Sequence, residues 1–216
     1  PGGHAQVEIN RVNIAERMYR ITGAGIYADS VLTGRKPPIK QPLLNANVLG
    51  QDSVQSVVYK GKIWWFWGDT NRISYPLGNF FTTCATSELP GKGGLDPGIG
   101  VDLEYIKDDE GFVKKMIPIP SEGNPVWLDS LIVMKDEKGV EKLCGDFIRV
   151  KTLGTNLERG IVIYNDEKGV FEKAADIPLD AVVGPVGQAV RVKQSAAGSE
   201  QSAGFIYFTS PYQNIR

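Results

Sequence analysis

The sequence reads DSVQSVVYKGKIWWFWGDTNR over residues 52–72 and DSLIVMKDEKGVEKLCGDFIR over residues 129–149. Both segments begin with Asp-Ser, continue as two apolar runs around a glycine-containing turn, and end in Gly-Asp and an arginine. In each segment the second aspartate comes 17 residues after the first, and the arginine comes 20 residues after it. Apolar runs of this length around a turn are typical of β-hairpins, and the equal spacing predicts two copies of one structural unit.

The rest of the chain consists of short runs rich in β-branched and aromatic residues, separated by Gly, Pro and Asp. A third, degenerate copy of the unit runs from residue 188 to residue 211. Helical periodicity is confined to residues 7–19, where a short helix could form. We therefore predict an all-β fold. Its expected strands cover residues 54–67, 80–86, 101–106, 112–119, 131–134, 140–144, 161–164, 189–192 and 205–208.

The composition excludes several classes of function. The 216 residues include 24 basic and 25 acidic ones, so the chain lacks the positive charge that nucleic acids and anionic membranes attract. No apolar run approaches the roughly 20 residues that span a bilayer. The single histidine, His4, excludes a Ser-His-Asp triad or a multi-histidine zinc site, and Cys84 and Cys144 show no CxxC spacing. The acidic turns lack the spacing of calcium loops, so we expect no metal and no cofactor.

Hairpin geometry predicts which residues face each other. If the first unit turns at residues 60–61, residue i pairs with residue 121 − i, and Asp52 faces Asp69 within about 5 Å. If the second unit turns at residues 137–138, Asp129 faces Asp146 in the same way. Carboxylates this close repel each other unless a cation or a bound substrate compensates, or one of them is protonated.

The nearest candidates for compensation are the arginines of the repeat. Arg72 and Arg149 each follow the second aspartate of their unit by three residues. We expect them to lie beside the carboxylates and to lower the carboxylate pKa values.

The strand between the first pair of aspartates is apolar on both faces. Residues 63–67 alternate isoleucine, tryptophan and phenylalanine with no polar position, so neither face is left to water. A sheet buried on both faces, repeated every 60 to 77 residues or so, suits the blades of a β-propeller. A two-sheet sandwich, the competing architecture, would show a polar outer face. We expect Trp64, Trp65 and Trp67 to pack in the core rather than to stack on sugars.

Three motifs, GQDS at 50–53, WFWGDT at 65–70 and WLDS at 127–130, resemble those of the five-bladed β-propeller glycoside hydrolases. This superfamily contains arabinanase-, xylosidase- and fructosidase-like enzymes and endo-arabinanase-like relatives. The resemblance implies a carbohydrate substrate, an axial pocket of carboxylates and a secreted or periplasmic location. By position, Asp52 would be the first-blade general base or nucleophile, and Asp129 the second-blade carboxylate that orients substrate and modulates pKa values.

The resemblance also implies a division of the chain. Residues 1–44 would lead into an incomplete propeller over residues 45–216. Its blade units would lie near residues 50–120, 125–180 and 185–216, which amounts to about two and a half blades. Five blades need roughly 300 residues, so we expect the remainder to come from the same longer polypeptide or from a second chain.

Four further residues are candidates for substrate binding, together with the second aspartate and the arginine of each unit. Asp29 belongs to another Asp-Ser step, and Gln188 begins the third copy where the family pattern has a carboxylate. Tyr212 and Asn214 follow the third copy. The alternative to a hydrolase is a non-catalytic propeller that binds glycan or protein, with the aspartates holding blade corners through backbone N–H groups.

Overall fold

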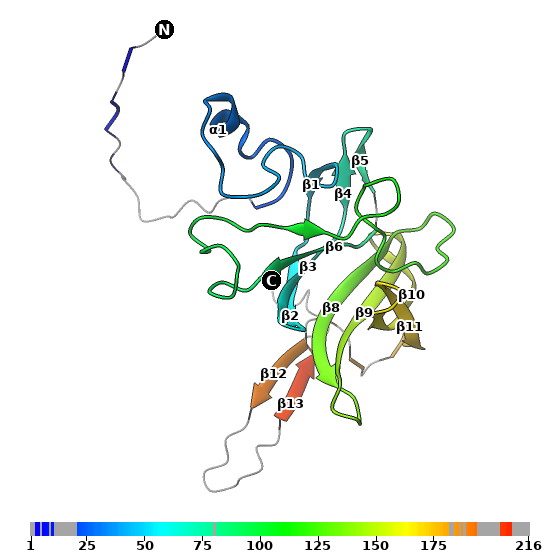
Figure 1. Ribbon diagram of the computed structural model, residues 1–216. Coiled ribbons are helices and arrows are strands. Elements are labelled where there is room, and N and C mark those ends of the chain that lie inside the picture. Colours follow the sequence, from blue (N-terminus) through cyan, green and yellow to red (C-terminus); the bar gives the residue numbers. More distant parts are fainter. Residues whose placement is uncertain are drawn as a thin grey trace, which may run out of the picture.

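The computed structural model shows an all-β chain, as the sequence predicts, built from antiparallel sheets that do not close into a barrel (Figure 1). The residues that it describes are 3–4, 6–8, 10, 21–79, 81–181, 184–185, 187, 189–193 and 204–208. Two sheets have four strands each. Sheet I has the order β2-β3-β6-β7, with β2 (Gln55–Tyr59), β3 (Lys62–Trp67), β6 (Thr83–Glu88) and β7 (Glu104–Tyr105). Sheet II is a meander of β8 (Val126–Lys135), β9 (Glu141–Thr152), β10 (Thr155–Asn165) and β11 (Val170–Asp176).

Two smaller sheets flank this pair. One consists of β1 (Val48–Gln51), β4 (Thr70–Arg72) and β5 (Tyr75–Asn79), and the other is the hairpin of β12 (Ala189–Lys193) and β13 (Gly204–Phe208). β2 lies beside β8, and β8 lies beside β12, so the first strands of three successive sheets are neighbours (Figure 1). A short helix that the sequence analysis missed, α1 (Ala28–Leu32), precedes β1. Of the expected helix over 7–19, residues 9 and 11–19 lie outside the described residues.

The predicted register of the first hairpin is confirmed. Gln55 pairs with Phe66, and Tyr59 pairs with Lys62. Lys60 and Gly61 both have positive φ, 47° and 79°, so they form the two-residue turn that suits the twist of a hairpin. The ladder continues to Asp52, whose N–H donates to the Asp69 carbonyl at 3.2 Å.

The predicted register of the second hairpin is wrong by one residue, because its turn has three residues instead of two. The N–H of Asp136 donates to the carbonyl of Val140 at 2.9 Å, and Gly139 takes φ 78° inside this loop. Ser130 therefore faces Asp146. A β-bulge at Asp129 then absorbs the extra residue.

β3 packs against apolar side chains on both of its faces, as its alternation predicts. Phe66 is 1% exposed and belongs to a core that sheet I shares with sheet II. Trp67 is 3% exposed and belongs to a second core on the opposite face. Trp64 packs against the first core and Trp65 against the second, which agrees with the expected packing role. The two sheets thus share one apolar interface, to which sheet II contributes Phe147, Val162 and Phe171.

The strand expected over residues 112–119 is not formed, and the strand expected over 101–106 shortens to β7. The apolar residues of the first segment instead pack between the sheets, where Met116 and Ile117 are fully buried. The N–H of Met116 donates to the Thr82 carbonyl at 2.9 Å, and the Met116 carbonyl accepts from the N–H of Phe171 at 2.8 Å. This residue therefore joins the two sheets by its backbone, so its hydrogen bonds serve two partners rather than one ladder.

Gly160 provides a test of the sheet II packing. A Cβ at this position would meet the Ala175 carbonyl oxygen and lie 3.0 Å from Cε1 of Phe147. We expect Gly160→Ala to lower the free energy of unfolding by about 1–3 kcal/mol, because the backbone or Phe147 must shift. Gly154→Ala in the neighbouring turn is the matched control, since its Cβ would meet nothing within 4 Å. Urea unfolding measures both, and equal stability of the two variants would contradict this packing.

Candidate functional site

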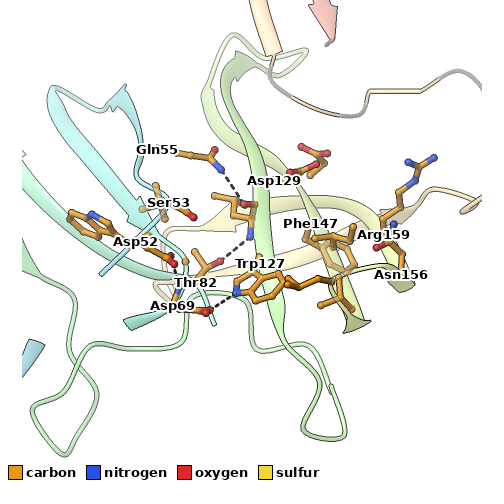
Figure 2. A pocket seen from close by; sticks show the side chains of 18 residues that line it. Asp52, Ser53, Gln55, Asp69, Thr82, Trp127, Asp129, Phe147, Asn156 and Arg159 are labelled. Carbon is orange, nitrogen blue, oxygen red and sulfur yellow. Dashed lines mark hydrogen bonds between the residues drawn. The ribbon is translucent and has the colours of Figure 1, made fainter. Parts of the chain in front are cut away.

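The four aspartates of the two repeat units line one cavity. Its volume is about 680 Å³, and its wall is formed by residues of both large sheets (Figure 2). Asp52 and Asp69 come from the open end of the β2–β3 hairpin, and Asp129 and Asp146 come from β8 and β9. The repeat alone did not show that the two pairs meet. They meet because β2 and β8 are neighbours and the two hairpins run side by side.

Asp52 closes the first hairpin. Its Oδ1 accepts the backbone N–H of Asp69 at 3.0 Å, and the N–H of Gly68 donates to its carbonyl at 3.1 Å. Gly68 leaves room for this arrangement, since a Cβ there would lie 2.9 Å from Asp52 Oδ1. Within the described part of the chain, no hydrogen bond engages the other carboxylate oxygen, and the side chain is exposed.

Asp69 is tied to the opposite sheet. Its Oδ1 accepts the indole N–H of Trp127 at 2.9 Å, a contact that joins sheet I to β8 across the cavity (Figure 2). Burial raises the pKa of the Asp69 carboxyl, the Trp127 hydrogen bond opposes that rise, and the nearby Asp52 charge adds to it. The hydrogen bond between Asp69 and Trp127 therefore holds the two sides of the cavity wall together.

Asp129 occupies the bulge of β8. Its side chain is half-buried, and among the described residues no hydrogen-bond donor reaches its carboxylate. Burial raises its pKa, and the guanidinium of Arg159 lowers it. A desolvated carboxylate without a donor is more basic and more available to a ligand than a capped one.

Asp146 is the most deeply buried of the four, with 4% of its surface exposed. The Ser130 hydroxyl donates to its Oδ1, and the N–H of Gly187 donates to its Oδ2 at 3.3 Å. Burial raises its pKa to about 6, and the charge of Asp129 adds to that rise, while the two hydrogen bonds oppose it. Asp146 thus titrates near neutral pH beside Asp129.

The other predicted site residues lie elsewhere. Arg149 donates to Glu158 at 2.8 Å, and Arg72 lies 3.9 Å from Glu110 and over the ring of Phe112. Neither arginine lines the cavity, so the expected compensation of the aspartates by Arg72 and Arg149 is wrong. Asp29 lies in α1, exposed and away from the cavity. The predictions for Gln188, Tyr212 and Asn214 fall outside the described residues.

The cation beside Asp129 is Arg159, which the sequence analysis missed. It lies on β10 opposite Ile148, which in turn pairs with Trp127, so these three side chains share one face of sheet II. The only hint in the sequence is a charged residue in the otherwise apolar run 159–164. Without the sheet order, that hint does not point to Asp129.

Comparisons with models of known protein families, with curated proteins and with solved structures returned no significant match. Within the described residues, no helix is long and apolar enough to cross a membrane. The same residues contain no group of three or more side chains placed to hold a metal ion.

The raised pKa of Asp146 predicts a pH-dependent stability. A raised carboxyl pKa stabilises the folded state below the unfolded value of 3.8, and this contribution is lost as the pH rises through about 6. Asp146→Asn removes the titrating carboxyl, and the amide oxygen of the asparagine can still accept the hydrogen bond from the Gly187 N–H. The free energy of unfolding of the variant, minus that of the unchanged protein, should therefore rise by about 2–3 kcal/mol as the pH increases from 4 to 7.

Urea unfolding at pH 4, 5, 6 and 7 measures this difference. Glu137→Gln, at the exposed tip of the β8–β9 hairpin, is the control for loss of a carboxyl from the same hairpin. A stability difference for Asp146→Asn that does not change with pH would contradict the assignment.

Proposed function

We propose that this cavity is the carbohydrate site of a glycoside hydrolase. The observation that carries the proposal is the meeting of four aspartates in one cavity of about 680 Å³, in environments that differ from one another. Cleavage of a glycosidic bond needs one group that is ionised and one that holds a proton, and carboxyls in different environments differ in protonation. Of these two groups, the described part of the cavity offers the ionised one. A volume of this size suits a ligand of a few sugar rings.

The roles follow from the hydrogen bonds. Asp129 is the base or nucleophile, because its carboxylate has no donor among the described residues and is therefore open to a ligand. The cation of Arg159 favours its ionised form, against the effect of burial. Asp146 keeps a proton up to about pH 6, but Ser130 and Gly187 occupy its oxygens, so it modulates Asp129 rather than reaching substrate. Asp52 offers its second oxygen to the ligand. On the family pattern, the acid that protonates the leaving oxygen comes from a later blade.

This assignment includes a propeller. Sheets I and II would be two blades, and β12–β13 the start of a third. Sheet II supports this reading with a second apolar face, on which Ile132, Cys144 and Ile163 lie side by side and are only half-buried. A further blade would cover that face, as sheet II covers sheet I. The remaining blades would come from the same longer polypeptide or from a second chain.

The second candidate function is a non-catalytic module that binds glycan or protein. The observation in its favour is the hydrogen bond from the Asp69 N–H to Asp52, which gives the Asp52 carboxylate a structural task at the hairpin corner. Under this alternative, the cavity binds sugar without breaking it.

Asparagine variants separate these functions. In the full-length protein, Asp129→Asn should lower turnover of linear arabinan or xylan oligosaccharides by about 100- to 10,000-fold, the usual contribution of one acid–base group. Asp52→Asn should lower turnover less, because Asp52 binds the ligand and transfers no proton. Thermal stability should stay constant or rise for Asp129→Asn, since a desolvated charge is removed. The amide oxygen introduced by Asp52→Asn can still accept the Asp69 N–H, so that variant should also stay folded.

A reducing-sugar assay and thermal melts of the same samples give both quantities, with Glu137→Gln as the control that loses a carboxyl outside the cavity. Full activity in Asp129→Asn would reject the hydrolase mechanism. Binding of the oligosaccharides without hydrolysis by the unchanged protein would favour the binding module.

A further inference from the structure

Two buried polar atoms of the cavity residues have no hydrogen-bond partner among the described residues. They are Oε1 of Gln55, an acceptor, and Nε of Arg159, a donor. A buried polar atom without a partner destabilises a fold by about 1–3 kcal/mol, and such atoms are rare in folded proteins. Their presence in the wall of one cavity therefore needs an explanation.

Each side chain is held by its other end. The Nε2 of Gln55, on β2, donates to the Leu128 carbonyl at 3.0 Å, and the terminal nitrogen NH2 of Arg159, on β10, donates to the carbonyls of Pro178 and Ala181. These anchors explain the orientation of both residues. They leave the acceptor of one residue and the donor of the other unused.

The two residues lie on opposite sides of Asp129. Figure 2 shows Gln55 on the side of sheet I and Arg159 on the side of β10, with Asp129 between them. Trp127 adds an aromatic surface on the same face of sheet II as Arg159. The arrangement around the reactive carboxylate is thus an unused acceptor, an unused donor and a ring.

We infer that Gln55 and Arg159 are the residues that position a neutral sugar ring over Asp129. Hydroxyl groups can donate and accept, so one ring can donate a hydroxyl to Gln55 and offer an oxygen to Arg159. The inference requires each side chain to rotate on ligand binding so that its unused atom reaches the cavity surface. The surrounding aspartates disfavour an anionic sugar, because a carboxylate or sulfate would meet Asp52, Asp69 and Asp129.

This inference rests on the proposed function, since it assigns the substrate class of the same cavity. The inference differs from the proposed function in one respect: Gln55 and Arg159 take no part in bond cleavage and act only by binding the sugar. A neutral trisaccharide should therefore depend on them for affinity, whether or not it is cleaved.

The test is isothermal titration calorimetry with 1,5-α-L-arabinotriose and 1,4-β-xylotriose, with galacturonic acid trimer as the anionic comparison. The full-length protein carries Asp129→Asn, so that binding is measured without turnover. In this background, Gln55→Leu removes the acceptor at similar volume. Arg159→Lys keeps a cation on the same strand that can donate to the two carbonyls, but has no N–H at the Nε position.

We expect at least one neutral trisaccharide to bind, and each second substitution to weaken its binding about tenfold or more. The anionic trimer should bind more weakly than either neutral one. Thermal melts and binding by the Glu137→Gln control show whether a loss is specific to the cavity. Affinity unchanged by both substitutions, or tighter binding of the anionic trimer, would overturn the inference.

The outcomes also separate this inference from the proposed function. Binding that depends on Gln55 and Arg159, in a protein that cleaves none of the sugars, would keep the inference and reject the hydrolase. Cleavage by Gln55→Leu and Arg159→Lys, made in the chain that retains Asp129, with an unchanged KM would keep the hydrolase and reject the inference. Absence of binding by both neutral trisaccharides would reject the inference.

Discussion

The packing of sheet II against sheet I is the contact on which the rest of the structure depends. The shared core contains a group of aromatic rings: those of Phe66 and Phe171 lie 5.5 Å apart, and those of Trp64 and Tyr164 lie 5.0 Å apart. Rings at these separations bury a large apolar area and add about 0.5–1.5 kcal/mol per pair. Because the two sheets meet over this core, the starts of β2 and β8 come together at one edge, and the carboxylates at those starts share a cavity.

Burial then decides the chemistry of those carboxylates more than their mutual repulsion does. For Asp69, Asp129 and Asp146, desolvation is the largest cause of the raised pKa, and the charge of a neighbouring aspartate is a smaller one or is absent. From the sequence, we expected repulsion between facing aspartates to dominate their pKa values. Withdrawal from water outweighs it because the cavity wall covers part of Asp69 and Asp129 and nearly all of Asp146.

The sequence predicted features that depend on neighbouring residues better than features that depend on residues far apart in the chain. The register of the first hairpin and the two buried faces of β3 depend on residues close in sequence, and both were predicted. The placement of residues 112–119 between the sheets, with the backbone of Met116 bonded to both, depends on a partner about 35 residues before it and another 55 residues after it. Apolar alternation cannot distinguish such a segment from a strand. Arg159 was missed for the same reason, since its relation to Asp129 requires the order of three strands.

The difference between the two repeat units shows how one turn residue can change a site. The units have equal length, yet the first turns through Lys60-Gly61, and the second takes a three-residue loop that ends in Gly139. The extra loop residue shifts Ser130 into the place opposite Asp146, and the bulge that restores the ladder expels Asp129 from the pairing. Asp52 instead accepts the Asp69 N–H with its side chain. Two units of equal length and spacing therefore yield one carboxylate anchored by a backbone N–H and one that accepts no hydrogen bond from the described residues. This asymmetry leaves Asp129, and not Asp52, available as the base of the proposed function.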